Sequence, residues 1–369
     1  MRTELRHGAT TAVTAALLLA LAGCTAMPVI GPAAPSSSAP AVASRAPAPT
    51  AAPLACEDLA PEAEIAAALS EPNAVVTPSS APDASIIGAL AVQGAGGLSC
   101  SWTTPQVSVA RPSRLLTVSL LPDAVNDWSA QIFGDAPTSL RRTFAGVSAA
   151  ADCGDPGCAA SMVVGTTWVR VDLLANGTET HGSAFPVSDE TVFANAQPAI
   201  ESVIAAVRRA SAAELTFPDH LSSATTPPDC SSVLSTSALA KVMGDSSATY
   251  DTRFQLTAAS DSIDGAALER IHAVRCFTEG SGSSAVTALI TIAPGQAWAV
   301  AALSDDPTAR GDLAPTTVPG QASGDRALSS CAGDHVNQCG IVLSLGGDAI
   351  QIEDTSEPEP LAAAIVAAG

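Results

Sequence analysis

The chain has 369 residues, of which 47% are hydrophobic and 14% are charged, and its formal net charge at pH 7 is −20. This length is sufficient for two globular domains of about 100 to 200 residues each. An acidic surface repels nucleic-acid phosphates and anionic lipid head groups. The composition therefore excludes nucleic acid as a partner.

The first residues are typical of a secretory signal. Arg2 and Arg6 make the start positive, and residues 12–21 form an apolar run. This run is shorter than the roughly 20 residues of a membrane-spanning helix. It ends in Leu-Ala-Gly-Cys at residues 21–24, which resembles the lipobox of bacterial lipoproteins. The resemblance implies that residues 1–23 are removed and that Cys24 receives a diacylglyceryl group. An ordinary signal with a chance cysteine is the alternative.

A lipid anchor at Cys24 predicts a protein on the extracytoplasmic face of the cell membrane, because two acyl chains hold a protein stably. The membrane is then a partner through the lipid alone. Removal of the leader takes away Arg2, Arg6 and Glu4, two positive charges and one negative, so the formal net charge becomes −21.

Residues 24–55 comprise the lipidated cysteine and a linker rich in Ala, Pro and Ser. Such a composition cannot bury a core. Closely spaced prolines favour extended polyproline II at about 3.1 Å per residue, a reach of up to about 90 Å for this segment. Both a stalk across a cell wall and a disordered linker without further role fit the same composition.

Eight more cysteines form two quartets of similar spacing. The first quartet is Cys56, Cys100, Cys153 and Cys158, and the second is Cys230, Cys276, Cys331 and Cys339. The intervals are 44, 53 and 5 residues in the first and 46, 55 and 8 in the second. An even number of cysteines in an exported chain indicates disulfide bonds. The repeated spacing predicts a tandem duplication, with repeat 1 at residues 56–211, a linker at 212–229 and repeat 2 at 230–369.

Four cysteines in one repeat allow three pairings. We favour Cys56–Cys100 and Cys153–Cys158 because Gly-Asp-Pro-Gly between the latter two suits a turn. The same reasoning pairs Cys230 with Cys276 and Cys331 with Cys339. The alternative is a metal site, supported by His335 between the last two cysteines. Repeat 1 has no histidine at that place, so we expect neither a metal nor a cofactor.

The two repeats have the same predicted order of elements. In repeat 1 these are a helix at 61–69, strands at 98–102 and 115–121, a hairpin of 159–164 with 167–174, and a closing helix at 200–207. In repeat 2 they are 236–243, 274–276, 286–292, 340–345 with 349–353, and 361–366. This order predicts an α+β fold in each repeat, an antiparallel sheet with helices packed on one face. We expect each repeat to fold alone.

Several of these features together resemble the small cell-envelope lipoproteins of actinobacteria. They are the lipobox, the Ala/Pro/Ser linker, a cysteine that opens a helix, Cys-Ser-Trp at residues 100–102 and a terminal helix rich in Ala, Val and Ile. The resemblance implies an α+β domain exposed in the envelope, without an established activity. Repeat 2 has Cys-Phe-Thr at 276–278 instead of Cys-Ser-Trp. No binding residue is therefore carried over.

The residues that could carry chemistry also have structural explanations. The histidines are not spaced as a metal pair on one helical face; they are His181, His220, His272 and His335. Asp305 and Asp306 could act as acid and base, but adjacent acids before a proline more often form a turn. Asp261 and Asp264 resemble the start of a calcium loop, but the residues after them lack further oxygen ligands.

Trp128 and Trp298 follow equivalent strands of the two repeats, and we expect each to lie in a helix. A matched tryptophan indicates core packing more often than a ligand platform.

Two functions from different classes remain. One is a non-enzymatic binding or scaffold protein that contacts an envelope protein, a polymer or a small ligand. The other is an envelope hydrolase or modifying enzyme whose side chains come from several loops. An enclosed cleft with converging polar groups would favour the enzyme, and shallow surfaces would favour the scaffold.

Overall fold

A computed structural model describes the chain in fourteen segments, called the described residues below. They are 52–70, 76–79, 86–104, 114–130, 132, 141–154, 157–175, 188–222, 228–251, 262–280, 288–305, 313–330, 339–355 and 358–369. The leader, Cys24 and almost all of the Ala/Pro/Ser linker lie outside them. Thr50–Gly369 is one compact unit. Within the described segments, no helix is both long enough and apolar enough to span a membrane.

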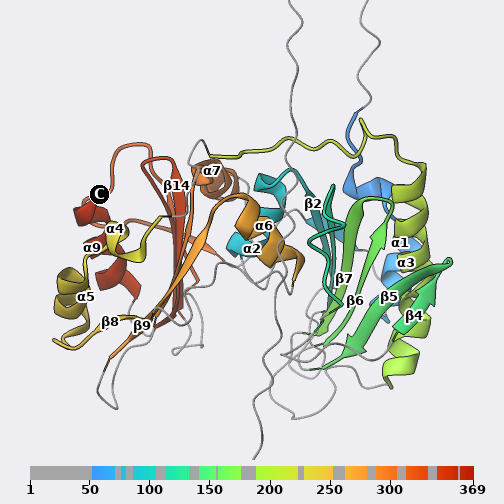
Figure 1. Ribbon diagram of the computed structural model, residues 1–369, viewed down its shortest axis with the longest axis horizontal. Coiled ribbons are helices and arrows are strands. Elements are labelled where there is room, and N and C mark those ends of the chain that lie inside the picture. Colours follow the sequence, from blue (N-terminus) through green and yellow to red (C-terminus); the bar gives the residue numbers. More distant parts are fainter. Residues whose placement is uncertain are drawn as a thin grey trace, which may run out of the picture. The chain divides into compact units, whose positions relative to one another are not determined.

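Repeat 1 contains an antiparallel sheet of seven strands in the order β1-β2-β3-β7-β6-β5-β4 (Figure 1). The strands are β1 Thr77–Ser79, β2 Leu98–Thr103, β3 Arg114–Leu121, β4 Arg141–Phe144, β5 Val147–Cys153, β6 Gly157–Val164 and β7 Thr167–Ala175. The helices are the 3₁₀ turn η1 Cys56–Asp58, α1 Glu62–Ala68, α2 Ile86–Gly94 and α3 Asp189–Arg209.

Repeat 2 contains a second seven-stranded antiparallel sheet, in the order β8-β9-β10-β14-β13-β12-β11. Its strands are β8 Thr249–Asp251, β9 Val274–Glu279, β10 Leu289–Ala293, β11 Ala314–Thr316, β12 Ala327–Ser329, β13 Cys339–Leu345 and β14 Asp348–Thr355. Its helices are α4 Cys230–Val233, α5 Thr236–Met243, α6 Ile263–Arg270, α7 Ala297–Asp305 and α9 Pro358–Ala368. The order matches sheet 1 strand for strand, from β8 as β1 to β11 as β4. The α+β fold and the duplication are confirmed.

Helices cover both faces of the sheet of repeat 1, called sheet 1. Neighbouring residues on a strand point to opposite faces, so two successive leucines of β3 show what packs on each face. Leu120 of β3 packs in one hydrophobic cluster with α1 and α3. The next residue, Leu121, packs in another cluster with α2. The sequence placed helices on one face only. It missed α2 because Ile-Ile-Gly-Ala-Leu-Ala-Val-Gln-Gly is apolar on all sides, as expected of a helix between two layers, and has no amphipathic period.

The other predicted elements are present, with some longer than expected. The closing helix of repeat 1 is α3, which contains Pro198 and begins at the cap residue Ser188. That of repeat 2 is α9, only about half as long. The sequence missed β1, β4 and β5 and their counterparts in repeat 2. These strands are three or four residues long or, as in β5, rich in alanine, so they carry little alternation.

Three disulfides follow the favoured pairing. Cys56–Cys100 joins η1 to β2, and the equivalent Cys230–Cys276 joins α4 to β9. Cys153 and Cys158 are bonded as directly opposed residues of β5 and β6. Cys331 and the side chain of Cys339 lie outside the described residues, so their pairing stays a prediction. On the loop-entropy model, each long bridge stabilises the fold by about 4 kcal/mol.

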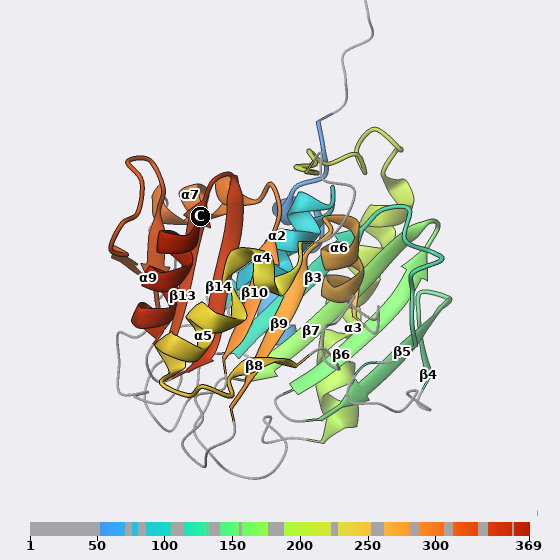
Figure 2. The ribbon, with the colours of Figure 1, turned by 60° about the vertical axis from the view of Figure 1, so that its left-hand side comes forward.

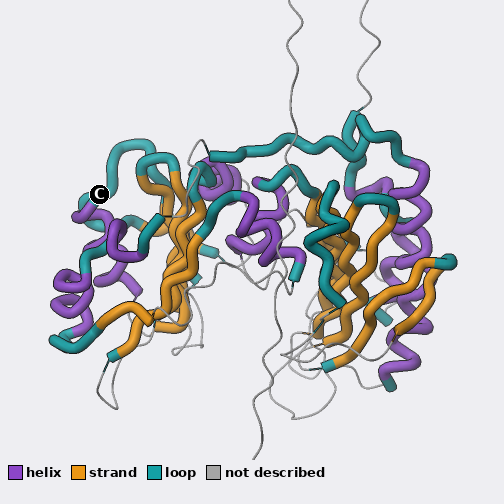
Figure 3. Tube along the Cα trace, viewed as in Figure 1, coloured by secondary structure: helices purple, strands orange, loops and turns teal. Residues whose placement is uncertain are grey.

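A third hydrophobic cluster joins the repeats. In it α2 packs against α6, and both views place the two helices side by side (Figures 1 and 2). Its buried members from repeat 1 include Ile87, Val92, Leu121 and Trp168. Its members from repeat 2 include Ile263, Leu268, Val300 and Val342. The coloured trace of Figure 3 shows helices beside the strands in each repeat. The predicted domain boundaries and autonomous folding are untested, but the repeats share this apolar layer.

Candidate functional site

Some residues singled out from the sequence lie outside the described residues. They are Cys24, His181, Asp261, Asp306, Cys331 and His335. Asp305 is the exposed last residue of α7, whereas Asp264 lies in the first turn of α6. The acid pairs 305–306 and 261–264 therefore stay without a structural description.

Trp128 and Trp298 both make structural contacts. Trp128 follows the turn at residues 125–127 after β3, which corrects the expected helix, and its Nε1 donates to Ser161 Oγ at 3.1 Å. Trp168 Nε1 donates to the same oxygen at 2.8 Å. Trp298 lies in α7, and its ring stacks on His220 with centroids 3.9 Å apart. Ser161 is thus the shared acceptor of two indoles, a contact that the sequence spacing did not reveal.

His220 fastens part of the inter-repeat linker to both repeats. Its backbone N–H donates to the carbonyl of Gly94 at the end of α2, at 3.0 Å. Its own carbonyl accepts from Gln296 Nε2, just before α7, at 2.8 Å. A Cβ on Gly94 would collide with Gln296 Oε1, so a larger residue at this position would displace the Gln296 amide. The linker, expected to be a plain connector, forms part of the junction.

Polar side chains tie each central helix to the opposite repeat. Arg270, the last residue of α6, donates to the carbonyls of Pro122 and Asp123 at 2.8 and 2.9 Å and to Asp127 Oδ2 at 3.0 Å. At the start of α2, the N–H of Ile87 donates to Gln351 Oε1 of β14 at 3.0 Å. The junction is therefore fixed by directed contacts as well as by apolar packing.

A group of charged side chains lies at this junction. Arg170 Nε in β7 contacts both carboxylate oxygens of Asp172, at 3.0 and 2.9 Å. Removal of the Asp264 carboxyl from water raises its pKa. The positive charges of Arg170 and Arg275 oppose this rise, and the negative charge of Asp172 adds to it. Arg275 Nε is buried and has no hydrogen-bond partner among the described residues. Such a group is either a candidate active site or an ionic contact that holds the repeats together.

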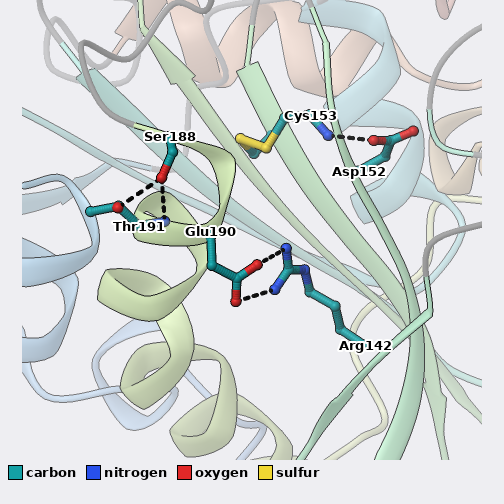
Figure 4. A network of polar contacts seen from close by, with 7 residues as sticks. Arg142, Asp152, Cys153, Ser188, Glu190 and Thr191 are labelled. Atoms are coloured by element: carbon teal, nitrogen blue, oxygen red, sulfur yellow. Dashed lines mark hydrogen bonds and ion pairs between the residues drawn. A yellow bond between two sulfur atoms is a disulfide. The ribbon is translucent and has the colours of Figure 1, made fainter.

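A second polar group lies beside the Cys153–Cys158 disulfide of repeat 1 (Figure 4). Arg142 in β4 makes two bonds to the Glu190 carboxylate, at 3.1 and 2.8 Å, and its guanidinium lies 4.3 Å from the ring centroid of Phe193. The hydrogen bonds to Arg142 lower the Glu190 pKa. These contacts attach the edge strand β4 to the start of α3.

The Cys153 and Cys158 sulfurs and an Asp189 oxygen lie within 4.8 Å of one another. Three such atoms could ligate a soft metal, but here the two sulfurs are bonded to each other. The arrangement is therefore that of a structural disulfide beside the first turn of α3.

A half-open surface pocket of about 290 Å³ lies between η1 and α3. Glu57 and Asp58 form its acidic wall and Leu59 contributes to its floor. Ser202, Ala205 and Arg209 line the other side from one face of α3. Opposite charges on two walls of one pocket suit a ligand that carries both charges. The sequence does not predict this pocket, because the residues on its two sides are more than 140 positions apart in the chain.

Comparisons of the chain with protein-family models, with curated proteins and with solved structures find no match.

Proposed function

We propose that the chain is a lipoprotein anchored to the extracytoplasmic face of the cell membrane, where it acts as a non-enzymatic binding or scaffold protein of the envelope. The observation that carries this proposal is a disulfide-bonded fold that follows a sequence resembling a lipobox at residues 21–24. Three disulfides indicate an oxidising compartment. The Leu-Ala-Gly-Cys sequence at residues 21–24 supplies the means of attachment.

The way the repeats are joined supports a binding role. A rigid unit loses little conformational entropy when it binds, because its surface is already ordered. The shared apolar cluster, the Arg270 contacts and the linker contact at His220 provide such rigidity. The pocket at η1 offers a small, charged recognition surface. Its partner would be an envelope protein, a polymer or a small ligand.

The alternative, an envelope hydrolase or modifying enzyme, has one observation in its favour. The raised pKa of Asp264 at the junction is the kind of perturbation found at catalytic acids. The neighbouring arginines and Asp172 are equally suited to an ionic contact between the repeats. We therefore place the binding role first.

The anchor is tested by expression of the wild type and the Cys24→Ser variant with a clickable fatty acid in the growth medium. The wild type should carry the label and sediment with membranes, whereas the variant should be unlabelled and either unprocessed or soluble. Processing of the wild type that is unaffected by globomycin, a lipoprotein signal peptidase inhibitor, would reject the lipid anchor.

The binding role is tested by photocrosslinking in the native envelope, with the crosslinker at Ala205 in the pocket and, as a control, at the exposed Asp305. A partner captured only from Ala205 supports the proposal. Identical products from both positions would contradict it. If the junction is an active site instead, Asp264→Asn should remove an envelope-modifying activity and leave capture intact.

A further inference from the structure

We propose that the pocket between η1 and α3, called the η1 pocket below, binds the two charged ends of a short zwitterionic peptide. This inference rests on the proposed binding function and names its ligand class. The ammonium group of the peptide would face Glu57 and Asp58, and its carboxylate would face Arg209. Four observations carry it: the free charges, the rigid walls, the size, and the absence of these charges at the equivalent place in repeat 2.

The charged ends of the η1 pocket are available. Glu57 and Arg209 are exposed, and neither has a hydrogen-bond or ion-pair partner among the described residues. Asp58 uses one carboxylate oxygen to accept from the Ala55 N–H at 3.0 Å, and its other oxygen remains. A guanidinium binds a carboxylate through two parallel hydrogen bonds, and a carboxylate pair favours an ammonium. The pocket therefore offers a complementary group to each end of a zwitterion.

The walls of the η1 pocket are held in place. The Cys56–Cys100 disulfide attaches η1 to the sheet, and Leu59 behind it is 1% exposed. Just before η1, the Leu54 N–H donates to the carbonyl of Glu214, in the segment after α3, at 2.9 Å. Ser202 in α3 donates to Glu64 in α1 at 2.6 Å. Little ordering is needed on binding, which favours even a small ligand.

The size of the η1 pocket restricts the ligand. Its volume of about 290 Å³ lies just below the range of about 300 to 1,000 Å³ for small-molecule sites. It suits a dipeptide better than a folded partner. Pro61 and Ala205 give it small apolar surface between the charges, which suits short side chains such as that of alanine.

Repeat 2 shows that the fold does not need these charges. By position after the first cysteine of each repeat, Glu57 and Asp58 correspond to Ser231 and Ser232. The closing helix α9 ends in alanines, where α3 ends in Arg208 and Arg209. The same architecture thus forms without acids at these two positions and without arginines at the end of the closing helix. Glu57 and Arg209, which have no partner among the described residues, are therefore free to serve recognition.

The test uses the full mature chain with Cys24→Ser, so that it is soluble without lipid, and the dipeptide alanyl-alanine. Binding is followed by amide chemical shifts and by calorimetry. N-acetyl-alanyl-alanine lacks the ammonium, and alanyl-alanine amide lacks the carboxylate. We expect each blocked peptide to bind at least about tenfold more weakly, the effect of one charged hydrogen bond. The shifts should concentrate at Ala205 and Glu57.

Two substitutions assign the ends of the peptide. Glu57→Gln should reduce the preference for the free over the acetylated peptide, because Asp58 remains, and Arg209→Gln should abolish the preference for the free acid over the amide. The matched controls are Glu62→Gln, an exposed acid of α1 outside the lining, and Arg208→Gln, whose guanidinium donates to the Ala145 carbonyl instead. Both controls should bind as the parent does. All four positions are exposed, and unchanged melting curves confirm that each variant is folded.

Equal affinity for the free and the blocked peptides would overturn the proposal. So would the absence of any chemical-shift change at the η1 pocket at about 10 mM dipeptide, a concentration far above the micromolar dissociation constants of specific sites. Failure here leaves the anchor and scaffold role intact if membrane attachment and capture of a larger partner still occur. If the lipid anchor is rejected but the dipeptide still binds, the pocket proposal stands and the anchor proposal does not. The two proposals are therefore separable.

Discussion

Repeat 1 and repeat 2 share one strand order, yet they differ in the residues at the ends of their helices. Both bond their first cysteine to the second strand of the sheet. Only repeat 1 has the acids of η1 and the arginines that end α3. The shared features are those the architecture requires. The unshared ones mark where function or local stability has diverged.

The largest effect is expected from removal of one long bridge in either repeat. Cys56→Ala with Cys100→Ala, and Cys230→Ala with Cys276→Ala, should each lower the free energy of unfolding by about 4 kcal/mol. Because α2 and α6 share one cluster, both double variants should shift the same calorimetric transition. Two separate transitions, with only one moved by each pair, would show that the repeats unfold independently. That result would support the boundary at residues 212–229.

Ser161→Ala tests a contact found in repeat 1 alone. The equivalent position on β13 is Val342, by its pairing with Gln351. The substitution leaves the N–H groups of Trp128 and Trp168 without their acceptor, and Trp168 is fully buried. We expect a loss of about 1 to 3 kcal/mol in urea unfolding, with altered tryptophan emission.

Ser99→Ala is the matched control for Ser161→Ala. Ser99 is also buried in sheet 1, but its hydroxyl oxygen has no partner in the described part of the chain. Its removal should therefore leave the stability unchanged or slightly higher. Equal losses in the two variants would mean that the indole contacts contribute nothing measurable.

The turns that follow α2 and α6 at the junction have the same geometry but a different residue at one position. After α2 the chain turns at Gly96 with φ of 76°, and after α6 it turns in the same way at His272 with φ of 57°. The hydrogen bonds agree, with Gly97 N–H to Val92 and Ala273 N–H to Leu268, both at 2.8 Å. A side chain in this left-handed conformation is strained, whereas glycine adopts it freely.

His272→Gly should therefore stabilise the protein by about 0.5 to 1 kcal/mol, measured by thermal and urea unfolding. The reverse change, Gly96→His, should destabilise it by a similar amount. A loss of stability in His272→Gly would show that the imidazole makes a contact worth more than the backbone strain.

The sequence predicted the duplication and three of the four proposed bridges, because the spacing of cysteines can be compared between repeats without any hydrophobic periodicity. It also placed β2, β3, β6 and β7, whose apolar residues alternate or form short aliphatic runs. It failed at the junction. Elements such as α2 pack between two layers and lose the polar face that identifies a helix. The Arg270 contacts and the η1 pocket depend on residues distant in the chain, which one sequence cannot bring together.

The last prediction concerns the charge at the junction and appears as a pH dependence. The pKa of Asp264 is raised in the folded chain because its carboxyl is removed from water, an effect that Arg170 and Arg275 only partly oppose. The folded state then binds the proton more tightly than the unfolded state does. The stability that this carboxyl contributes is complete below the unfolded value near 3.9 and is lost as the pH rises through the folded pKa.

Asp264→Asn removes this titration, so the free energy of unfolding of the wild type should fall relative to the variant as the pH rises above about 4. Urea unfolding of both proteins at each pH measures the difference. Asp305→Asn, at the exposed end of α7, controls for the loss of one negative charge. A difference that stays constant with pH would mean that Asp264 is ionised equally in both states. A wild type that gains on the variant as the pH rises would instead mean that the two arginines outweigh desolvation, and the group would then be a stabilising ionic contact between the repeats.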